Sequence, residues 1–132
     1  MKNTLFSIAE EMGAVLIRAA YSTNIKDRRD CSCGIYTNSG DLSAQAEHIP
    51  LHLGIMPSAV KTIIQYLDDE SVEIKKGDTF LCNDPFITGS HTWDLMVVTP
   101  VFHEKKIAAL VGNLAHHADI GEHKSNVATE AL

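Results

Sequence analysis

The amino-acid sequence predicts an α+β fold with a mainly antiparallel sheet and two helices. Two stretches carry apolar residues at the three-to-four spacing of an amphipathic helix, over residues 4–21 and from Pro57 onwards. Short apolar runs bounded by turn residues lie between and after these stretches, as in strands joined by tight turns. The order helix, hairpin, helix and three strands differs from regular βαβ winding, so antiparallel pairing is expected.

The first helix is predicted over residues 4–21, because its apolar side chains form one stripe along a helical surface. The stripe consists of Leu5, Ile8, Met12, Val15, Leu16, Ala19 and Ala20. Residues 21–24 end this helix, and a charged run over residues 26–30 follows. This run is interpreted either as a surface loop or as a place where Arg28 or Arg29 holds a carboxylate or phosphate.

A β-hairpin is predicted over residues 33–46, because residues 38–41 have the composition of a turn between two strand-like runs. Residues 47–56 are expected to form a polar connection. The second helix should then begin at Pro57, since proline is favoured in a first helical turn. It should fray at the acidic residues 68–70, whose charge opposes the helix dipole at that end.

Three further strands are predicted over residues 79–82, 95–102 and 107–114. The first should stop before Pro85, because proline cannot donate a hydrogen bond to a strand ladder. A turn over residues 103–106 should join the last two strands into a hairpin.

Composition indicates one soluble domain over residues 1–132, with 45% hydrophobic and 21% charged residues. The net charge of −6 and the lack of a basic stripe argue against a nucleic-acid partner. Glu10 and Glu11 interrupt any secretory signal, and no apolar run is long enough for a membrane span. Three cysteines, two of them spaced as Cys31-x-Cys33, suit a reducing compartment. We therefore expect a cytoplasmic protein without membrane contact.

Two histidine-containing clusters are the strongest candidates for chemistry: residues 91–94 and residues 116–119. The hairpin of residues 95–102 and 107–114 would bring the two clusters to the same end of the sheet. His91 and Asp94 point to opposite faces in a regular strand, so they converge only if the backbone bends. Two imidazoles and a carboxylate with open positions suit a catalytic Mn, Fe, Zn, Co or Ni site better than a Ca site.

Each of these residues also has an ordinary structural interpretation. A single His-x-x-Asp is common, and of two adjacent histidines one is often buried and the other exposed. Glu47 and His48, with His52, are candidates for a general base or for partners of the ligands, or else they bridge loops. Asp84 is a candidate catalytic carboxylate, or only part of the turn that stops a strand. The cysteines form either a thiolate site or, as we expect, buried inert thiols.

Nucleotide and serine-hydrolase motifs are absent from the sequence. It contains no G-x-x-x-x-G-K-[ST], no G-x-G-x-x-G after a strand and no G-x-S-x-G. The chain therefore shows no nucleotide-binding loop and no serine nucleophile of its own.

Five sequence runs, in order along the chain, resemble the hydantoinase B family, which includes 5-oxoprolinase and the metal subunit of acetone carboxylase. The runs cover residues 10–33, 44–57, 77–86, 91–102 and 115–121, and include A-Q-A-E-H-I-P-L-H-L-G-I-M-P and A-H-H-A-D-I-G. The resemblance implies ATP-linked hydrolysis of a cyclic amide of the hydantoin or 5-oxoproline type. It also implies a hydantoinase A-type partner subunit that handles ATP, an oligomeric assembly and a small-molecule substrate.

The resemblance further implies a divalent metal, with manganese favoured over zinc or iron, held by His91, Asp94 and His116. His117 is the alternative ligand if the loop register differs. Glu47, His48 and Asp84 are the expected catalytic residues. Thr88, Trp93 and Glu122 depart from the family pattern around these motifs, so the loops and substrate contacts are expected to differ.

Family members run to several hundred residues, so the resemblance implies that this chain is a truncated, N-terminal part of a larger fold. Such a part is expected to be inactive alone. Two alternatives remain open at this point: a fragment of a ketone carboxylase subunit with the same site, and a non-catalytic assembly piece that completes the fold of a partner by covering an exposed sheet edge.

Overall fold

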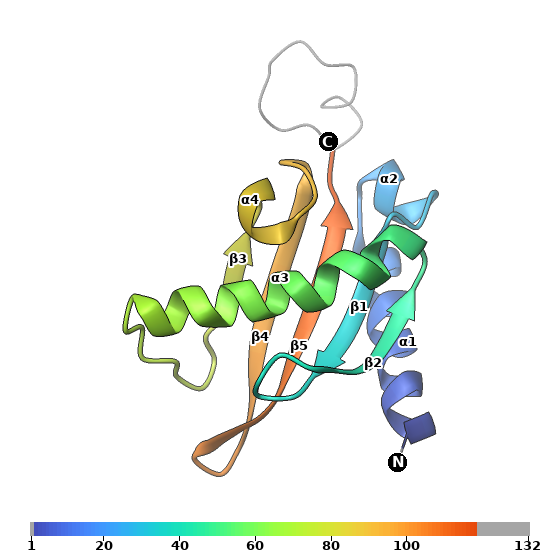
Figure 1. Cartoon of the computed structure of the whole chain (residues 1–132). Coiled ribbons are helices and arrows are strands. Elements are labelled where there is room, and N and C mark those ends of the chain that lie inside the picture. The colour runs from blue at the N-terminus through green and yellow to red at the C-terminus, as the bar shows by residue number, and fades with distance from the viewer. Residues whose placement is uncertain (1, 119–132) are drawn as a thin grey trace.

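A computed structural model describes residues 2–118 and shows one five-stranded antiparallel sheet with helices on both faces (Figure 1). The elements in chain order are α1 (Lys2–Ala19), α2 (Thr23–Lys26), β1 (Cys31–Tyr36), β2 (Leu42–Glu47), α3 (Pro50–Asp69), β3 (Phe80–Cys82), α4 (Pro85–Thr88), β4 (Asp94–His103) and β5 (Lys106–His116). The predicted α+β class and antiparallel sheet are confirmed, and α2 and α4 are two single-turn helices beyond the two long ones expected.

The strand order is β2-β1-β5-β4-β3, and every neighbouring pair is antiparallel. The hairpin of β4 and β5 is the longest ladder. It runs from the pair Asp94 and His116 at one end to the pair His103 and Lys106 at the turn. This register fixes which side chains meet at the end of the hairpin far from the turn.

The two long helices pack on opposite faces of the sheet. Helix α3 crosses the strands on one face, whereas α1 lies behind β1 and β2 on the other (Figure 1). The larger core lies under α3 and contains Tyr36, Met56, Val60, Ile63, Leu67, Met96, Val98, Leu110 and Leu114. A smaller cluster under α1 joins Ala9 to Ile35 and Ala46.

The predicted start of the second helix is wrong. Helix α3 begins at Pro50, which occupies its first turn, and it continues through Pro57. Buried His52 and Met56 extend the apolar stripe of the helix by two turns towards the N-terminus, and this packing outweighs the backbone hydrogen bond that Pro57 cannot donate. Part of the expected polar connection over residues 47–56 is therefore helical.

The expected fraying at residues 68–70 is also not observed, since α3 extends to Asp69. The Gln65 side chain donates a hydrogen bond to the Asp69 carboxylate, and Leu67 is buried in the larger core. Burial of Leu67 in this last turn outweighs the unfavourable interaction of the acidic groups with the helix dipole.

The Tyr36 ring lies over two paired glycines in the centre of the sheet. Gly34 and Gly112 face each other across β1 and β5. A Cβ atom at Gly34 would lie 2.5 Å from the Tyr36 hydroxyl oxygen, and one at Gly112 would lie 3.1 Å from the ring. The two glycines therefore create the space that the buried ring fills.

Candidate metal centre

A tight turn brings His91 and Asp94 together. The His91 carbonyl accepts a hydrogen bond from the Asp94 backbone N–H at 2.9 Å, so these residues do not form a regular strand. Just before them, Gly89 adopts a left-handed conformation with φ of 72° at the end of α4, which glycine tolerates without strain. Ser90 then bonds the Thr88 hydroxyl at 3.1 Å. The backbone bend that convergence required is thus present.

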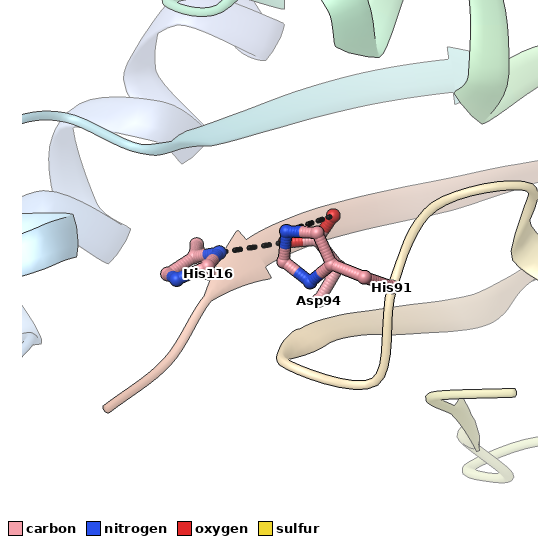
Figure 2. A group of neighbouring side chains, drawn as sticks. All are labelled: His91, Asp94 and His116. Carbon is pink, nitrogen blue, oxygen red and sulfur yellow. Dashed lines mark hydrogen bonds and ion pairs between the residues drawn. The ribbon is translucent and has the colours of Figure 1, made fainter. Parts of the chain in front are cut away.

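The register of the β4–β5 hairpin adds the third residue. Asp94 and His116 are direct partners across the ladder, so their side chains project from the same face. The Nδ1 atom of His116 lies 3.1 Å from one carboxylate oxygen of Asp94, and the Nε2 atom of His91 lies 3.8 Å from the other (Figure 2). One ligand atom from each of the three residues lies within 4.8 Å of the others.

The three side chains differ sharply in exposure. The Asp94 side chain is 4% exposed and that of His116 is 16% exposed, whereas that of His91 is 57% exposed. The Trp93 ring packs edge-on against both imidazoles, with centroid separations of 5.7 Å to His116 and 6.4 Å to His91. The carboxylate of Asp94 is therefore the buried member of the group, and the imidazole of His91 is the member that solvent reaches most easily.

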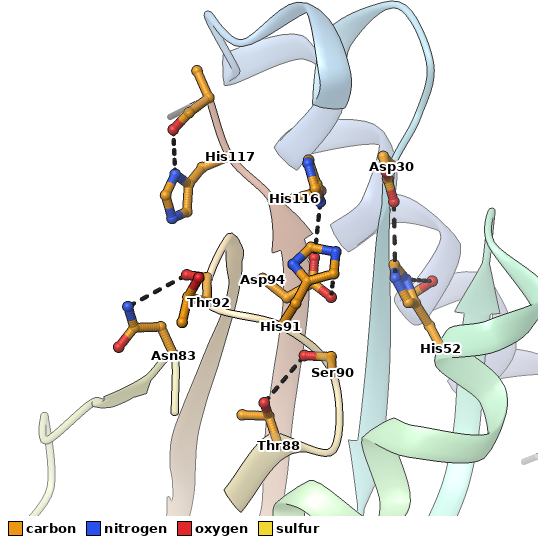
Figure 3. Close-up of polar contacts among 12 residues, drawn as sticks. Asp30, His52, Asn83, Thr88, Ser90, His91, Thr92, Asp94, His116 and His117 are labelled. Atoms are coloured by element: carbon orange, nitrogen blue, oxygen red, sulfur yellow. Dashed lines mark hydrogen bonds and ion pairs between the residues drawn. The ribbon is translucent and has the colours of Figure 1, made fainter. Parts of the chain in front are cut away.

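A second polar group adjoins the first, with Asp30 and His52 visible beside His116 in Figure 3, and it also includes Ser32. The Nδ1 atom of buried His52 lies 3.0 Å from the Ser32 hydroxyl, and its Nε2 atom lies 3.8 Å from the Asp30 carboxylate. The Asp30 carbonyl accepts the backbone N–H of His116. Asp30 therefore contacts both groups: its backbone fixes His116 and its side chain faces His52.

Sequence reasoning missed the part that Asp30 plays, because it treated residues 26–30 only as a charged run. The role of Asp30 arises because β1 begins at Cys31, two residues earlier than expected, and pairs with β5, which places Asp30 beside His116. This pairing is not local in the sequence.

Burial lowers the pKa of His52, and the imidazoles of His116 and His91 act in the same direction, while the carboxylates of Asp94 and Asp30 oppose it. The neutral imidazole is therefore favoured in the folded state relative to the unfolded chain, where the pKa is about 6.5. The contribution of neutral His52 to the free energy of unfolding is therefore complete above the unfolded-state pKa. It is lost as the pH falls towards the lower pKa of the folded state.

We expect the free energy of unfolding to fall as the pH is lowered from 7 to 5, with His52 contributing at most about 1.4 kcal/mol per pH unit. The variant His52→Asn keeps a polar group near Ser32 and removes the titration, so its slope should be smaller. Urea unfolding at several pH values measures this slope. The exposed His103→Ala variant serves as the control and should keep the slope of the unmodified chain. An unchanged slope in His52→Asn would show that His52 does not contribute to the pH dependence of the free energy of unfolding.

The structure does not bring the expected catalytic residues Glu47, His48 and Asp84 into the group of His91, Asp94 and His116, as far as their side chains are described. The Nε2 atom of His48 is buried against Gly13 of α1. Asp84 caps α4, where its carboxylate accepts the Phe86 N–H at 2.9 Å. The side chain of Glu47 lies outside the part of the structure that is described; its backbone ends β2 opposite Ser32.

The neighbouring histidine, His117, is placed differently from His116. His117 directs its Nδ1 atom to the Ala118 carbonyl, so His116 is the residue of this pair that joins His91 and Asp94. Asp119 lies outside the described residues.

The three cysteines are free thiols, and Cys31 and Cys33 are buried beneath α1. Burial, with a smaller contribution from Asp30, raises the pKa of Cys31 to about 11. Burial, followed by Cys31 and Glu10, raises the pKa of Cys33 to about 12. Since the thiolate is the reactive form, both should be inert in the folded protein.

Ellman's reagent at pH 8 is therefore expected to modify one thiol rapidly, that of half-exposed Cys82, and the other two only after unfolding. The Cys82→Ser variant should lack the rapid phase. A rapid phase that persists in this variant would show that the β1 thiols are accessible.

The chain is therefore an α+β protein unit that places two imidazoles and a carboxylate together at one end of a hairpin. The chain belongs to the Hydantoinase B/oxoprolinase family, whose profile matches residues 1–130. Within residues 2–118, no helix has the length and apolar character needed to cross a membrane.

Similar proteins support this membership. A protein of Methanocaldococcus jannaschii is 50% identical over 121 residues, which is 92% of this chain and 22% of that protein. The 5-oxoprolinase of Dictyostelium discoideum is 46% identical over 87% of this chain and 9% of its own length. The chain thus spans about a fifth or less of the curated relatives that it matches.

Two solved structures share the fold. Nucleotide-free acetone carboxylase matches with a TM-score of 0.79 and 24% identity, over 90% of this chain and 16% of its own. The ATP-dependent caprolactamase from Pseudomonas jessenii matches with a TM-score of 0.70 and 25% identity, over 91% of this chain and 21% of its own.

Proposed function

We propose that this chain is the metal-binding portion of an ATP-linked hydrolase that opens a cyclic amide of the hydantoin or 5-oxoproline type. The observation that carries the proposal is the meeting of His91, Asp94 and His116 at one end of the β4–β5 hairpin. A ligand set of two imidazoles and a carboxylate with open positions is typical of catalytic metal sites.

The donor set fits a single transition-metal ion. Ligands at about 2.1 Å from one ion lie roughly 3.0–3.5 Å apart. The His116 and His91 nitrogens lie 3.1 and 3.8 Å from the two different carboxylate oxygens of Asp94, so both imidazoles already adjoin this carboxylate. The ligand atoms lie within 4.8 Å of one another, and a rotation of the exposed His91 side chain would shorten its distance to the other two. A cation would also neutralise the Asp94 carboxylate, whose burial is otherwise unfavourable.

A bound divalent ion would act as a Lewis acid on a carbonyl or phosphoryl oxygen, or would lower the pKa of a bound water. We favour manganese, with zinc or iron as alternatives. The residues of this chain have supporting tasks. Asp94 would hold the ion together with the two imidazoles, Asp30 fixes the His116 backbone, and the Trp93 ring shields one side of the site.

A cyclic amide is favoured over a ketone as the substrate because this chain is more similar in sequence to 5-oxoprolinases than to acetone carboxylase. The 5-oxoprolinases of Dictyostelium discoideum and Arabidopsis thaliana are 46% and 41% identical to this chain. Acetone carboxylase, at 24% identity, supports the fold alone. ATP would be handled by a hydantoinase A-type partner in an oligomeric assembly, and the free thiols suit a cytoplasmic location.

Metal binding by the purified chain tests the site directly. Calorimetric titration with Mn²⁺ and Zn²⁺, together with metal analysis by mass spectrometry, should show one ion per chain. A chain that binds no transition metal above the level of the triple variant His91→Ala/Asp94→Asn/His116→Ala would refute the proposed site.

The substrate assignment needs a second experiment, since activity belongs to the assembly. The chain is mixed with a hydantoinase A-type subunit, and ATP hydrolysis is followed with 5-oxoproline, hydantoin or acetone. Stimulation by the cyclic amides supports the proposal, whereas stimulation by acetone and bicarbonate would favour the carboxylase alternative.

A further inference from the structure

We infer that a helix from the remainder of the hydantoinase B fold packs beside α1 and covers the half of the sheet that α1 leaves open. Helix α1 lies over β1 and β2, while no described helix lies behind β3 and β4 in Figure 1. On the opposite face, α3 crosses the strands and buries Met96 and Val98 of β4. The sheet is thus covered on one face and half covered on the other.

The side chains on the open half are mainly apolar. Successive residues of a strand point to opposite faces, so Val97 and Val101 of β4 face away from α3, and Thr99 between them shares a hydrogen bond with Thr79. Val97 pairs with Leu81 of β3 on one side and with Asn113 of β5 on the other. Leu81 and Val101 are exposed, and Val97 is half-buried. A row of apolar side chains open to water is the surface that a further layer normally covers.

Helix α1 presents a matching apolar side. It packs on the sheet through Leu5, Ala9 and Met12, yet Ile8 and Val15 project sideways towards the open half. Val15 is 51% exposed. A groove of about 510 Å³ runs between this side of α1 and Asn113 of β5, and Glu11 is its one charged lining residue.

The dimensions fit one helix. Strands lie about 4.8 Å apart, so β5, β4 and β3 together span roughly 10–15 Å. Helices packed side by side lie about 8–10 Å apart. One amphipathic helix beside α1 would therefore contact both the groove and Val97, Val101 and Leu81.

The lengths of the relatives favour the rest of the fold as the occupant. The matched region is 22% of the Methanocaldococcus jannaschii protein and 16% and 21% of the two solved structures, so most of each chain is available to supply such a helix. A second copy of this chain is disfavoured by its net charge of −6, which opposes self-association.

Cysteine accessibility tests this inference without unfolding either protein. Val15→Cys and Val101→Cys are introduced singly into this chain and at the aligned positions of the intact Methanocaldococcus jannaschii relative. Ala14→Cys is the matched control, because Ala14 is exposed on α1 and does not line the groove. Maleimide labelling is quantified by peptide mass spectrometry, and circular dichroism verifies folding.

In this chain, all three cysteines should react rapidly. In the intact relative, the cysteines aligned with Val15 and Val101 should react at least tenfold more slowly, while the control changes little. Equal rates in the two proteins would overturn the inference. Protection in this chain itself, together with a dimer by sedimentation, would assign the face to a second copy and also overturn it. Neither result depends on metal binding, so the proposed function is tested separately.

Discussion

Replacement of Asp94 by asparagine is expected to lower the affinity of the chain for Mn²⁺ or Zn²⁺ by at least about 100-fold. Loss of an outer partner of a ligand already costs about 10–100-fold, and Asp94 both supplies the only carboxylate of the group and contacts both imidazoles. His116→Ala should have a comparable effect. His91→Ala should weaken binding less, because the exposed imidazole must rotate to reach the ion.

Two histidine variants serve as controls for this prediction. His103→Ala lies at the opposite end of the same hairpin, and His117→Ala removes the neighbour of the proposed ligand. Both should retain the affinity of the unmodified chain in calorimetric titration. A loss in His117→Ala that equals the loss in His116→Ala would show that the loop register differs from the structure.

The substitution Gly34→Ala is expected to destabilise the fold by about 3 kcal/mol, the upper end of the usual range for overpacking. The added methyl group would lie 2.5 Å from the Tyr36 hydroxyl oxygen and 2.8 Å from two ring atoms. The ring cannot move away easily, because Gly112, Met96 and Val60 surround it in the same core. Urea unfolding monitored by circular dichroism measures the loss.

Gly54→Ala is the matched control, since nothing lies within 4 Å of its Cβ position in α3, and it should stabilise the protein by about 0.5–1 kcal/mol. Tyr36→Phe removes a buried hydroxyl that has no hydrogen-bond partner among the described residues, so it should be neutral or stabilising. Gly34→Ala should be less harmful in that background. Equal losses in both backgrounds would place the strain elsewhere.

Much of the sheet could be predicted from the sequence because its signals are local. The turn residues 103–106 and the two apolar runs beside them define the β4–β5 hairpin, and the structure has this hairpin. The start of α3 could not be predicted in the same way. Pro50 and Pro57 are both acceptable first-turn residues, and only the burial of His52 and Met56 against the sheet decides between them.

The meeting of the two clusters was predictable for a related reason, because a hairpin brings residues that are distant in the sequence to the same end of the sheet. The exact pairing was not predictable from the turn: the register of His103 with Lys106 would place Asp94 opposite Ala115, and the register shift between Val101 and Phe102 moves its partner to His116. The contribution of Asp30 and His52 depends on β1 pairing with β5 and on α3 crossing the sheet. Neither contact is encoded by a neighbouring residue, so no local pattern could indicate it.

The direct pairing of Asp94 with His116 also constrains how this protein can change in evolution and in engineering. A single residue inserted within either strand would turn one of the two side chains to the other face, because the strand repeat is two residues. The tip of the hairpin at Glu104 and Lys105 is free of this restriction, and at about 3.3 Å per residue it lies roughly 30 Å from Asp94. That tip is therefore the position at which a fluorophore or affinity tag can be attached while the two side chains keep their alignment.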